Sequence, residues 1–199
     1  MPKNKFWINS DDYSTDNYST DDYSIDEYSS EKSKDLQKCN DYYLYCDINS
    51  LTINKLIKFI KNLENWWKVF LDESKDIIKY VEPKPINIYI NSINGDIIAA
   101  FSAIDVIKNS IIPIHTYLEG ISNPASSLLC FISHKRFISK NALMIIYEKN
   151  KLIEYKYKKN ILLIKNLYLE KSIDIYKYSN KSLTSDECIK YNFVDEIIS

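Results

Sequence analysis

The spacing of hydrophobic positions changes twice between residues 84 and 120, and these changes mark the centre of the chain. Isoleucine alternates with polar or aromatic residues over 86–91, which is the two-residue period of a β-strand. Asn94-Gly95 is a turn signal, and Asp96 stands at the N-cap of the expected helix. Apolar residues then recur at helical spacing over 97–107, and another apolar run covers 111–118. The pattern predicts a β-α-β unit with two parallel strands.

The residues before this unit predict one strand and a helical region. Residues 42–46 favour a short strand that ends at Asp47, and Asn49 or Ser50 is the expected helix cap. We expect the apolar side of this helix to consist of Leu51, Ile53, Leu56, Ile57, Ile60 and Leu63. The apolar content continues to Tyr80, across a bend or in a second helix. The pair Trp66-Trp67 serves either core packing or a partner surface.

The residues after the central unit are less regular. Residues 152–169 are rich in lysine and aliphatic side chains and predict either a strand followed by a helix or one helix. Thr184 is the expected cap of a final helix over residues 185–191. Residues 193–198 predict a closing strand.

Residues 1–40 differ in composition from the rest and predict a separate tail, followed by one domain over residues 41–199. Four acidic pentads, DDYST, DNYST, DDYSI and DEYSS, fill residues 11–30. Such a polar tract buries too little apolar surface to offset the entropy of ordering, so we expect disorder. The tail is either a phosphorylatable or partner-binding segment or an inert extension.

Charge and hydropathy exclude several functional classes. Residues 1–30 contain two lysines and seven acidic residues (−5), and the total of −1 leaves +4 for the remainder. Neither value favours a nucleic-acid partner. No apolar run approaches the roughly 20 residues that span a bilayer, and the polar start resembles neither a signal nor a transit peptide. We therefore expect a soluble intracellular (cytoplasmic) protein, not secreted, without a membrane partner.

The four cysteines predict neither a metal site nor a disulfide framework. Cys39, Cys46, Cys130 and Cys188 form no C-x-x-C pair and no metal-ligand spacing with the two histidines. We expect free thiols in a reducing compartment and neither a metal nor a cofactor.

The central stretch resembles the proteolytic subunit of the Clp protease, a serine peptidase with the ClpP/crotonase-like fold. Residues 84–92 read KPINIYINS, against KPINLYINS in the family, and the match continues without a gap to Gly120. Residues 135–137, 141–146 and 183–195 match further family motifs, so the resemblance covers about residues 42–199. It implies an α/β fold, a spiral of β-β-α units with a parallel sheet flanked by helices.

The resemblance also identifies where a catalytic triad would lie. The positions of the family's serine, histidine and aspartate correspond to Pro124, Tyr147 and Tyr176, with Asp174 two residues from the last. Proline has no hydroxyl, and a phenol with a pKa near 10 is a poor general base at neutral pH. Gly95 matches a glycine whose N–H faces the oxyanion in the family, although the turn itself would also require glycine.

A displaced nucleophile is the alternative. A slipped alignment places Ser126 on the family's serine, and Ser122 and Ser127 lie nearby. We expect His115 and His134 to be structural or solvated, so a base is still missing. The segment 148–175 is also about twenty residues shorter than the strand–helix handle through which two rings of the family face each other.

The resemblance therefore predicts a Clp-like subunit that is catalytically inactive. Its expected partners are Clp-type subunits in a homo- or hetero-oligomer, a Clp ATPase, or unfolded polypeptide. The alternative is an active serine-type endopeptidase that uses Ser126 or Ser122. Acyl-CoA chemistry, known for crotonase relatives, ranks last because the sequence has no recognisable coenzyme A site.

Overall fold

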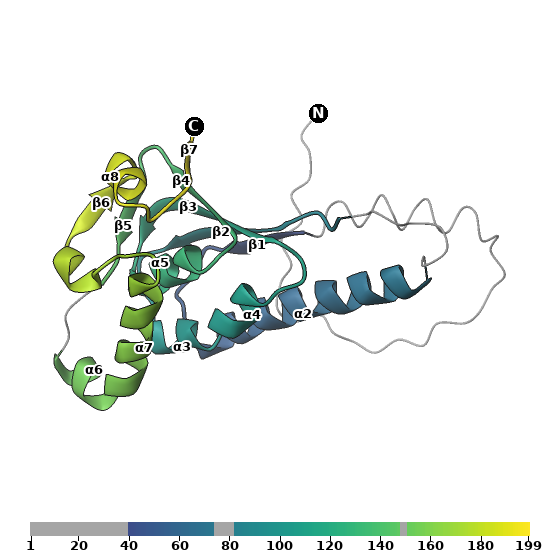
Figure 1. Cartoon of the computed structure of the whole chain (residues 1–199), viewed down its shortest axis with the longest axis horizontal. Coiled ribbons are helices and arrows are strands. Elements are labelled where there is room, and N and C mark those ends of the chain that lie inside the picture. Colours follow the sequence, from purple (N-terminus) through teal and green to yellow (C-terminus); the bar gives the residue numbers. More distant parts are fainter. Residues whose placement is uncertain (1–39, 74–81, 148–150) are drawn as a thin grey trace. The chain divides into compact units, whose positions relative to one another are not determined.

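The structure is a computed structural model that describes residues 40–73, 82–147 and 151–199 (Figure 1). The acidic repeat over 11–30 and the predicted tail up to Cys39 lie outside the described residues. The expected continuation of the first helical region to Tyr80 also lies partly outside them. No helix within the described ranges is long and apolar enough to cross a bilayer.

A seven-stranded sheet forms the centre of the fold. Its strands are Asp41–Leu44 (β1), Ile86–Ser92 (β2), Ile114–Ser122 (β3), Lys135–Ser139 (β4), Leu143–Ile145 (β5), Ser182–Thr184 (β6) and Glu196–Ile198 (β7). The order is β1-β2-β3-β4-β7, and β5 pairs with both β3 and β6. All these pairs are parallel except β5 with β6. The predicted class, α/β with a mostly parallel sheet flanked by helices, is confirmed.

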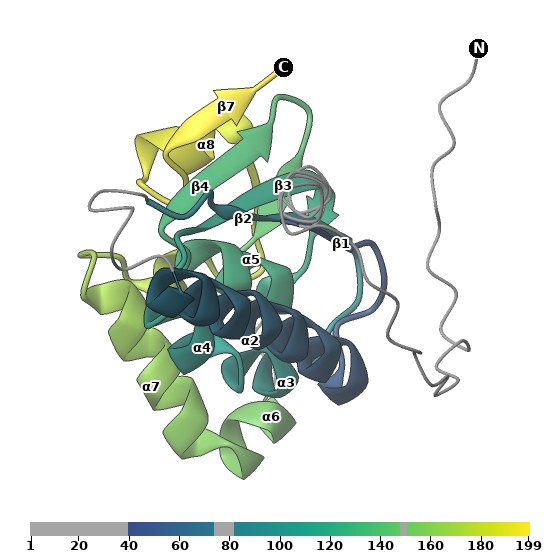
Figure 2. The ribbon, with the colours of Figure 1, turned by 90° about the vertical axis from the view of Figure 1, so that its right-hand side faces the viewer.

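The helices in the described part of the chain are Ser50–Glu73 (α2), Ile97–Phe101 (α3), Ile104–Lys108 (α4), Pro124–Phe131 (α5), Lys151–Lys156 (α6), Lys158–Leu169 (α7) and Ser185–Lys190 (α8). Figure 2 shows α2, α3, α4 and α5 together on the same side of β1–β4. The alternate residues Ile86, Ile88 and Ile90 of β2 face them and are fully buried. The core therefore lies between this face and the helices.

The predicted β-α-β unit is confirmed, but its helix is divided. Asp96 caps α3, because its carboxylate accepts a hydrogen bond of 2.8 Å from the N–H of Ile98. At Ser102 the hydroxyl donates to the carbonyl of Ala99 (2.7 Å), a local bond that competes with regular helix geometry. The chain resumes as α4 at Ile104, and β3 then pairs in parallel with β2.

The first helical region is one helix, α2, as far as Glu73, without the bend or second helix that was expected on the way to Tyr80; residues 74–81 lie outside the described part of the chain. Asn49 is its cap, with Oδ1 accepting from the N–H groups of Leu51 (2.9 Å) and Thr52 (3.1 Å). Leu51 was expected on the apolar side but is exposed, because the buried stripe is formed by Ile53, Leu56, Ile60 and Trp67. Trp67 packs into the core, whereas Trp66 is partly exposed and stacks on Phe70 at 5.5 Å.

Two other boundaries differ from expectation. The segment 152–169, for which the sequence left a strand and helix or one helix open, forms two helices, α6 and α7, separated at Tyr157 (φ −119°, ψ 35°). Strand β1 ends at Leu44 instead of Cys46, since its pairing with β2 stops at Ile90. The closing strand β7 is confirmed within the predicted range 193–198.

The predicted cap of the last helix is confirmed as a full capping box. Thr184 Oγ1 accepts from the N–H of Glu187 (3.3 Å), and Glu187 Oε2 accepts from the N–H of Thr184 (2.9 Å). Each bond satisfies a backbone donor that the first helical turn leaves unpaired.

Removing this cap should cost measurable stability. We expect Thr184→Ala to lower the free energy of unfolding by about 1 kcal/mol, as measured by urea denaturation. Ser182→Ala, an exposed change in the adjoining strand, is the matched control and should have little effect. Equal losses in both variants would contradict the role of the cap.

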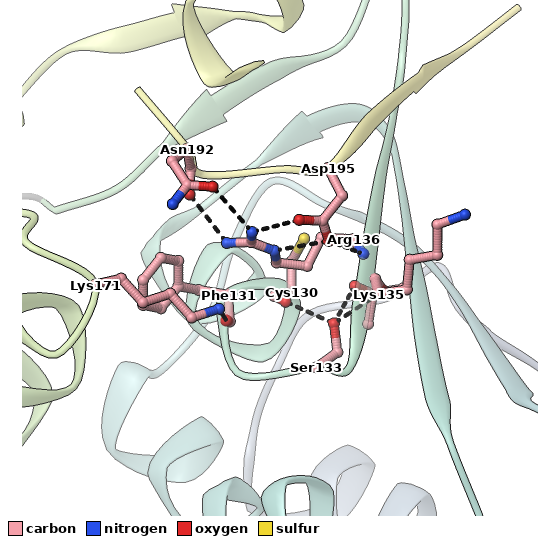
Figure 3. A network of polar contacts seen from close by, with 9 residues as sticks. Cys130, Phe131, Ser133, Lys135, Arg136, Lys171, Asn192 and Asp195 are labelled. Atoms are coloured by element: carbon pink, nitrogen blue, oxygen red, sulfur yellow. Dashed lines mark hydrogen bonds and ion pairs between the residues drawn. The ribbon is translucent and has the colours of Figure 1, made fainter. Parts of the chain in front are cut away.

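A buried arginine fixes the C-terminal segment to β4 (Figure 3). The guanidinium of Arg136 donates to both carboxylate oxygens of Asp195, at 3.0 Å from Nε and 2.5 Å from Nη2. It also donates to the carbonyl of Asn192 (3.0 Å). The backbones of Arg136 and Asp195 are bonded as well, so β7 is held next to β4 by charge and by hydrogen bonds.

Candidate functional site

The expected reaction centre lies where β2 and β3 end and α5 begins. Ser92 pairs with Ser122 at these strand ends, and Pro124 occupies the first turn of α5. Proline suits this position because its fixed φ matches the helix and the first helical N–H groups have no intrahelical partner. The position expected for the nucleophile is therefore a helix start.

Asn123 organises this helix start. Its Oδ1 accepts from the N–H groups of Ala125 (2.7 Å) and Ser126 (3.1 Å), which caps α5. Its Nδ2 donates to the carbonyl (2.9 Å) and the hydroxyl (3.2 Å) of Ser92. The side chain is buried, so it is a polar bridge between the end of β2 and the beginning of α5.

The same carboxamide lies directly against Gly95. A Cβ atom on Gly95 would come within 2.8 Å of Asn123 Oδ1, 2.9 Å of Asn123 Nδ2 and 3.0 Å of Ile48 Cβ. Among the described glycines only Gly120 has a positive φ, of 74°. Glycine is thus required at 95 for close approach and not for the backbone conformation of a turn, which corrects the sequence-based explanation.

Tyr147 and Tyr176, the residues expected at the histidine and aspartate positions, meet as an aromatic pair. The rings of Tyr147 and Tyr176 are 5.5 Å apart with an angle of 87° between their planes. The hydroxyl of Tyr147 donates to Oε1 of Glu154 at 2.5 Å. Burial and this bond to Glu154 raise the pKa of the phenol. Tyr147 therefore stays protonated at neutral pH, with its proton directed at a carboxylate of α6.

Asp174, which lies two residues before Tyr176 in sequence, is hydrogen-bonded to the backbone. Its Oδ1 accepts from the N–H of Tyr176 (3.1 Å) and caps a short 3-10 helix, Ile175–Tyr178.

The fallback serines are buried in structural hydrogen bonds. Ser126 Oγ donates to the carbonyl of Ser92 (3.3 Å), and Ser127 Oγ donates to the carbonyl of Ile145 (2.7 Å). Ser122 Oγ lies 3.0 Å from Ser127 Oγ. The hydroxyls of Ser122, Ser126 and Ser127 are all buried, so a substrate carbonyl does not reach them without movement of α5.

Both histidines lie near the opposite end of β3. His115 is the second residue of the strand and Ser122 the last, which at about 3.3 Å per residue separates them by about 23 Å. His134 Nδ1 accepts from the N–H of Ile114 (3.1 Å). Burial, Lys135 and His134 lower the pKa of His115. The structure does not bring either imidazole to the helix start at Pro124.

The cysteines and acidic residues do not assemble into a metal centre in the described part of the chain. No group of three or more histidine, cysteine or carboxylate side chains there could hold an ion. Burial raises the pKa of Cys130 to about 11 and that of Cys188 to about 12, and both are free thiols, as is the exposed Cys46.

A row of aromatic rings crosses the sheet face opposite the helices. Tyr43, Tyr89, Tyr117 and Phe137 occupy matching positions on β1–β4. Their rings stack at centroid distances of 4.9, 4.7 and 4.5 Å. Burial, Asp41 and neighbouring tyrosines raise the pKa of Tyr89 to about 12. Tyr43 is 60% exposed, so the row offers one edge of a rigid aromatic surface to solvent.

Sequence reasoning missed Asn123, which makes most of the polar contacts at this site. The signal was present, because asparagine is a favoured N-cap and proline a favoured first helical residue. The sequence Asn123-Pro124 thus indicates a capped helix start. Its contact with Gly95 depends on tertiary structure and has no local signature.

Comparison with known proteins places this geometry in a family. The family model described as Clp protease matches residues 70–199, which is more than half of the chain. The ClpP protease catalytic domain from Plasmodium falciparum is 23% identical, with a TM-score of 0.60, over 92% of this chain and 95% of that one. A ClpP1 mutant from Listeria monocytogenes is 22% identical, with a TM-score of 0.65, over 84% and 96%. At these identities the two structures show the fold alone.

Proposed function

This chain belongs to the Clp protease family, and from that membership we propose that it acts as a non-catalytic Clp-like subunit. Its role is structural or regulatory: it joins Clp-type subunits in a homo- or hetero-oligomer, or it binds a Clp ATPase or unfolded polypeptide without cutting it.

The single observation that supports it best is the Asn123-Pro124 pair. Serine peptidase chemistry needs a hydroxyl nucleophile and donors that face the developing oxyanion. Here Pro124 supplies no hydroxyl, and the Asn123 carboxamide packs where a Cβ of Gly95 would be. The space next to the one retained oxyanion-type residue is therefore filled by a structural cap.

The proton-transfer groups support the same conclusion. A general base must accept the proton of the nucleophile near neutral pH. The Tyr147 phenol has a raised pKa and donates to Glu154, and Tyr176 packs against its ring. Loss of triad members typically costs on the order of a million-fold in rate.

The retained scaffold supports a binding role. Tyrosine and phenylalanine are frequent anchors of protein interfaces because they bury a large area with little loss of side-chain entropy. Tyr43, Tyr89 and Tyr117 form such a surface, and the buried Phe137 stacks at its inner end. We place the binding of a partner protein on this sheet face.

Covalent labelling tests the absence of catalysis. We expect no adduct by intact mass when the purified full chain is treated with a fluorophosphonate probe, under conditions that label an active Clp subunit. The hydroxyls of Ser122 and Ser126 are buried and bonded, so neither is an activated nucleophile.

An adduct would instead support the serine-type endopeptidase. The proposal fails if the probe labels the chain and if Ser122→Ala, Ser126→Ala or Ser127→Ala abolishes the label. Ser133→Ala is the matched control, because its hydroxyl is also buried and donates to a backbone carbonyl, that of Cys130 (2.6 Å), but it follows the C-terminal end of α5.

A further inference from the structure

The dipeptide Asn94-Gly95 has the sequence at which asparagine loses its side-chain amide most readily. The loss begins when the next backbone nitrogen bonds to the carboxamide carbon, and glycine hinders this approach least because it has no Cβ. The chain contains two glycines, of which only Gly95 follows an asparagine. Asn94 and Gly95 are both exposed, so water reaches them. Of the asparagines in the chain, Asn94 is therefore the one with the most reactive neighbour.

The groups that would react at this dipeptide are free within the described part of the chain. Neither the carboxamide of Asn94 nor the N–H of Gly95 has a hydrogen-bond partner among the described residues. Asn49, which precedes a serine, differs because its carboxamide accepts from the N–H groups of Leu51 and Thr52 in the cap of α2. The structure thus leaves both reacting groups available at Asn94 and holds the carboxamide at Asn49.

The backbone around the dipeptide is held by a parallel bridge between Gly95 and Ile48, in the chain before α2. The N–H of Ile48 donates to the carbonyl of Asn94 (3.1 Å), and the N–H of Asp96 donates to the carbonyl of Ile48 (2.8 Å). The hydroxyl of Ser92 donates to the same Asn94 carbonyl (2.8 Å). Ile48 is buried, so breaking the bridge leaves polar groups without partners, at a cost in free energy. These bonds prevent the peptide plane between the two residues from turning toward the carboxamide.

We propose that Asn94 is a site of spontaneous deamidation, which proceeds when the bridge to Ile48 opens locally and yields a product that prevents the bridge from re-forming. In the first step the nitrogen of Gly95 bonds to Cγ of Asn94. The bond from Cγ to Nδ2 breaks, and the amide leaves as ammonia with the proton of the Gly95 N–H. Water then opens the cyclic imide. Its attack on the former side-chain carbonyl gives aspartate, and its attack on the main-chain carbonyl gives isoaspartate.

Isoaspartate removes the acceptor on which the bridge depends. The main chain then runs through the former side-chain carbons, and the carbonyl that accepted from Ile48 and Ser92 becomes part of a carboxylate branch. The chain is one atom longer before Gly95, so Gly95 and Asp96 no longer lie opposite Ile48. Conversion therefore releases the end of β2 from the chain before α2, and the release is not reversed by closing.

Ageing of the purified full chain in mildly alkaline buffer tests the site. We expect peptide mapping by mass spectrometry to find aspartate and isoaspartate at position 94 and unchanged asparagine at position 49. The urea-unfolded chain should convert faster, because it has no bridge. Aged wild type should lose part of its Tm, whereas aged Asn94→Gln, which changes an exposed side chain, should keep it. Intact Asn94 in the aged folded chain, beside conversion in the unfolded chain, overturns the inference, as do equal losses of Tm.

A second variant tests the role of the bridge. Ser92→Ala removes one donor to the Asn94 carbonyl, and loss of one hydrogen bond should raise the rate of conversion about fivefold. Ser133→Ala is the matched control, because it removes a buried hydroxyl that donates to the carbonyl of Cys130 (2.6 Å), beyond the C-terminal end of α5. It should leave the rate unchanged. Equal acceleration by both variants, or none by Ser92→Ala, overturns control of the reaction by local opening of the bridge.

Discussion

Replacing Asp195 by alanine is expected to lower the free energy of unfolding by about 3 kcal/mol. The change removes both carboxylate partners of Arg136, whose side chain is only 5% exposed, and leaves its charge without an anion. Breaking a buried ion pair from one side costs about 3–5 kcal/mol, and partial exposure of Asp195 puts the expected loss at the low end. Urea denaturation of the full chain measures it.

The neighbouring residue provides a matched control. Glu196 pairs with Lys135 at 3.2 Å, but both side chains are about half exposed. Exposed ion pairs contribute about 0–1 kcal/mol, so Glu196→Ala should cost little. Similar losses for Asp195→Ala and Glu196→Ala would contradict the view that burial of Arg136 gives its pair the larger effect.

The same pair predicts a pH dependence. Burial raises the pKa of the Asp195 carboxyl, but the hydrogen bonds and charge of Arg136 outweigh this effect and hold the pKa below its usual value. A folded-state pKa below that of the unfolded chain, about 3.9, gives stability that is present above this value and lost as the pH falls through the folded pKa. The difference in unfolding free energy between wild type and Asp195→Asn should therefore shrink on acidification below about pH 4.

The sequence predicted correctly those parts of the fold whose conformation depends on interactions between residues close together in the chain. The alternation over 86–91, the Asp96 cap and the Thr184 cap each depend on a few neighbouring residues, and all three are confirmed. The sequence gives only a weak indication of the break between α3 and α4. Serine also occurs inside helices, so Ser102 alone does not predict an interruption. Its hydrogen bond to the carbonyl of Ala99 becomes visible only in the structure.

The remaining errors arise from tertiary contacts. Leu51 is apolar and correctly spaced, yet it is exposed, since the sheet covers a stripe that begins at Ile53. The resemblance predicted that Pro124, Tyr147 and Tyr176 stand at the triad positions, but it did not predict which residues they contact. The contact between Tyr147 and Tyr176 and the bond from Tyr147 to Glu154 join residues that sequence periodicity does not relate.

Substituting Gly95 tests directly whether the Asn123 side chain is what excludes a side chain at position 95. We expect Gly95→Ala to lower the free energy of unfolding by about 2 kcal/mol, because its methyl would lie within 2.9 Å of both polar atoms of the Asn123 side chain. That side chain cannot swing away without breaking its bonds to Ser92, Ala125 and Ser126. In the Asn123→Ala background the clash with the carboxamide is absent, so the same Gly95→Ala change should cost less. Thermal or urea unfolding of the two single variants and the double variant measures this coupling, expected at about 1 kcal/mol.

Gly120 is the control position, because replacing it by alanine is expected to destabilise the protein for a reason that does not involve Asn123. Its φ of 74° makes any Cβ strained whatever surrounds it. Gly120→Ala should therefore cost the same in the wild-type and Asn123→Ala backgrounds, while Gly95→Ala should not. If Gly95→Ala were equally costly in both, the contact with Asn123 would not be what excludes a side chain there, and Ile48, whose Cβ lies 3.0 Å from the same point, would be the remaining obstacle. The cycle thus decides whether the space beside Gly95 is closed by the cap of α5 or by the packing of the chain before α2.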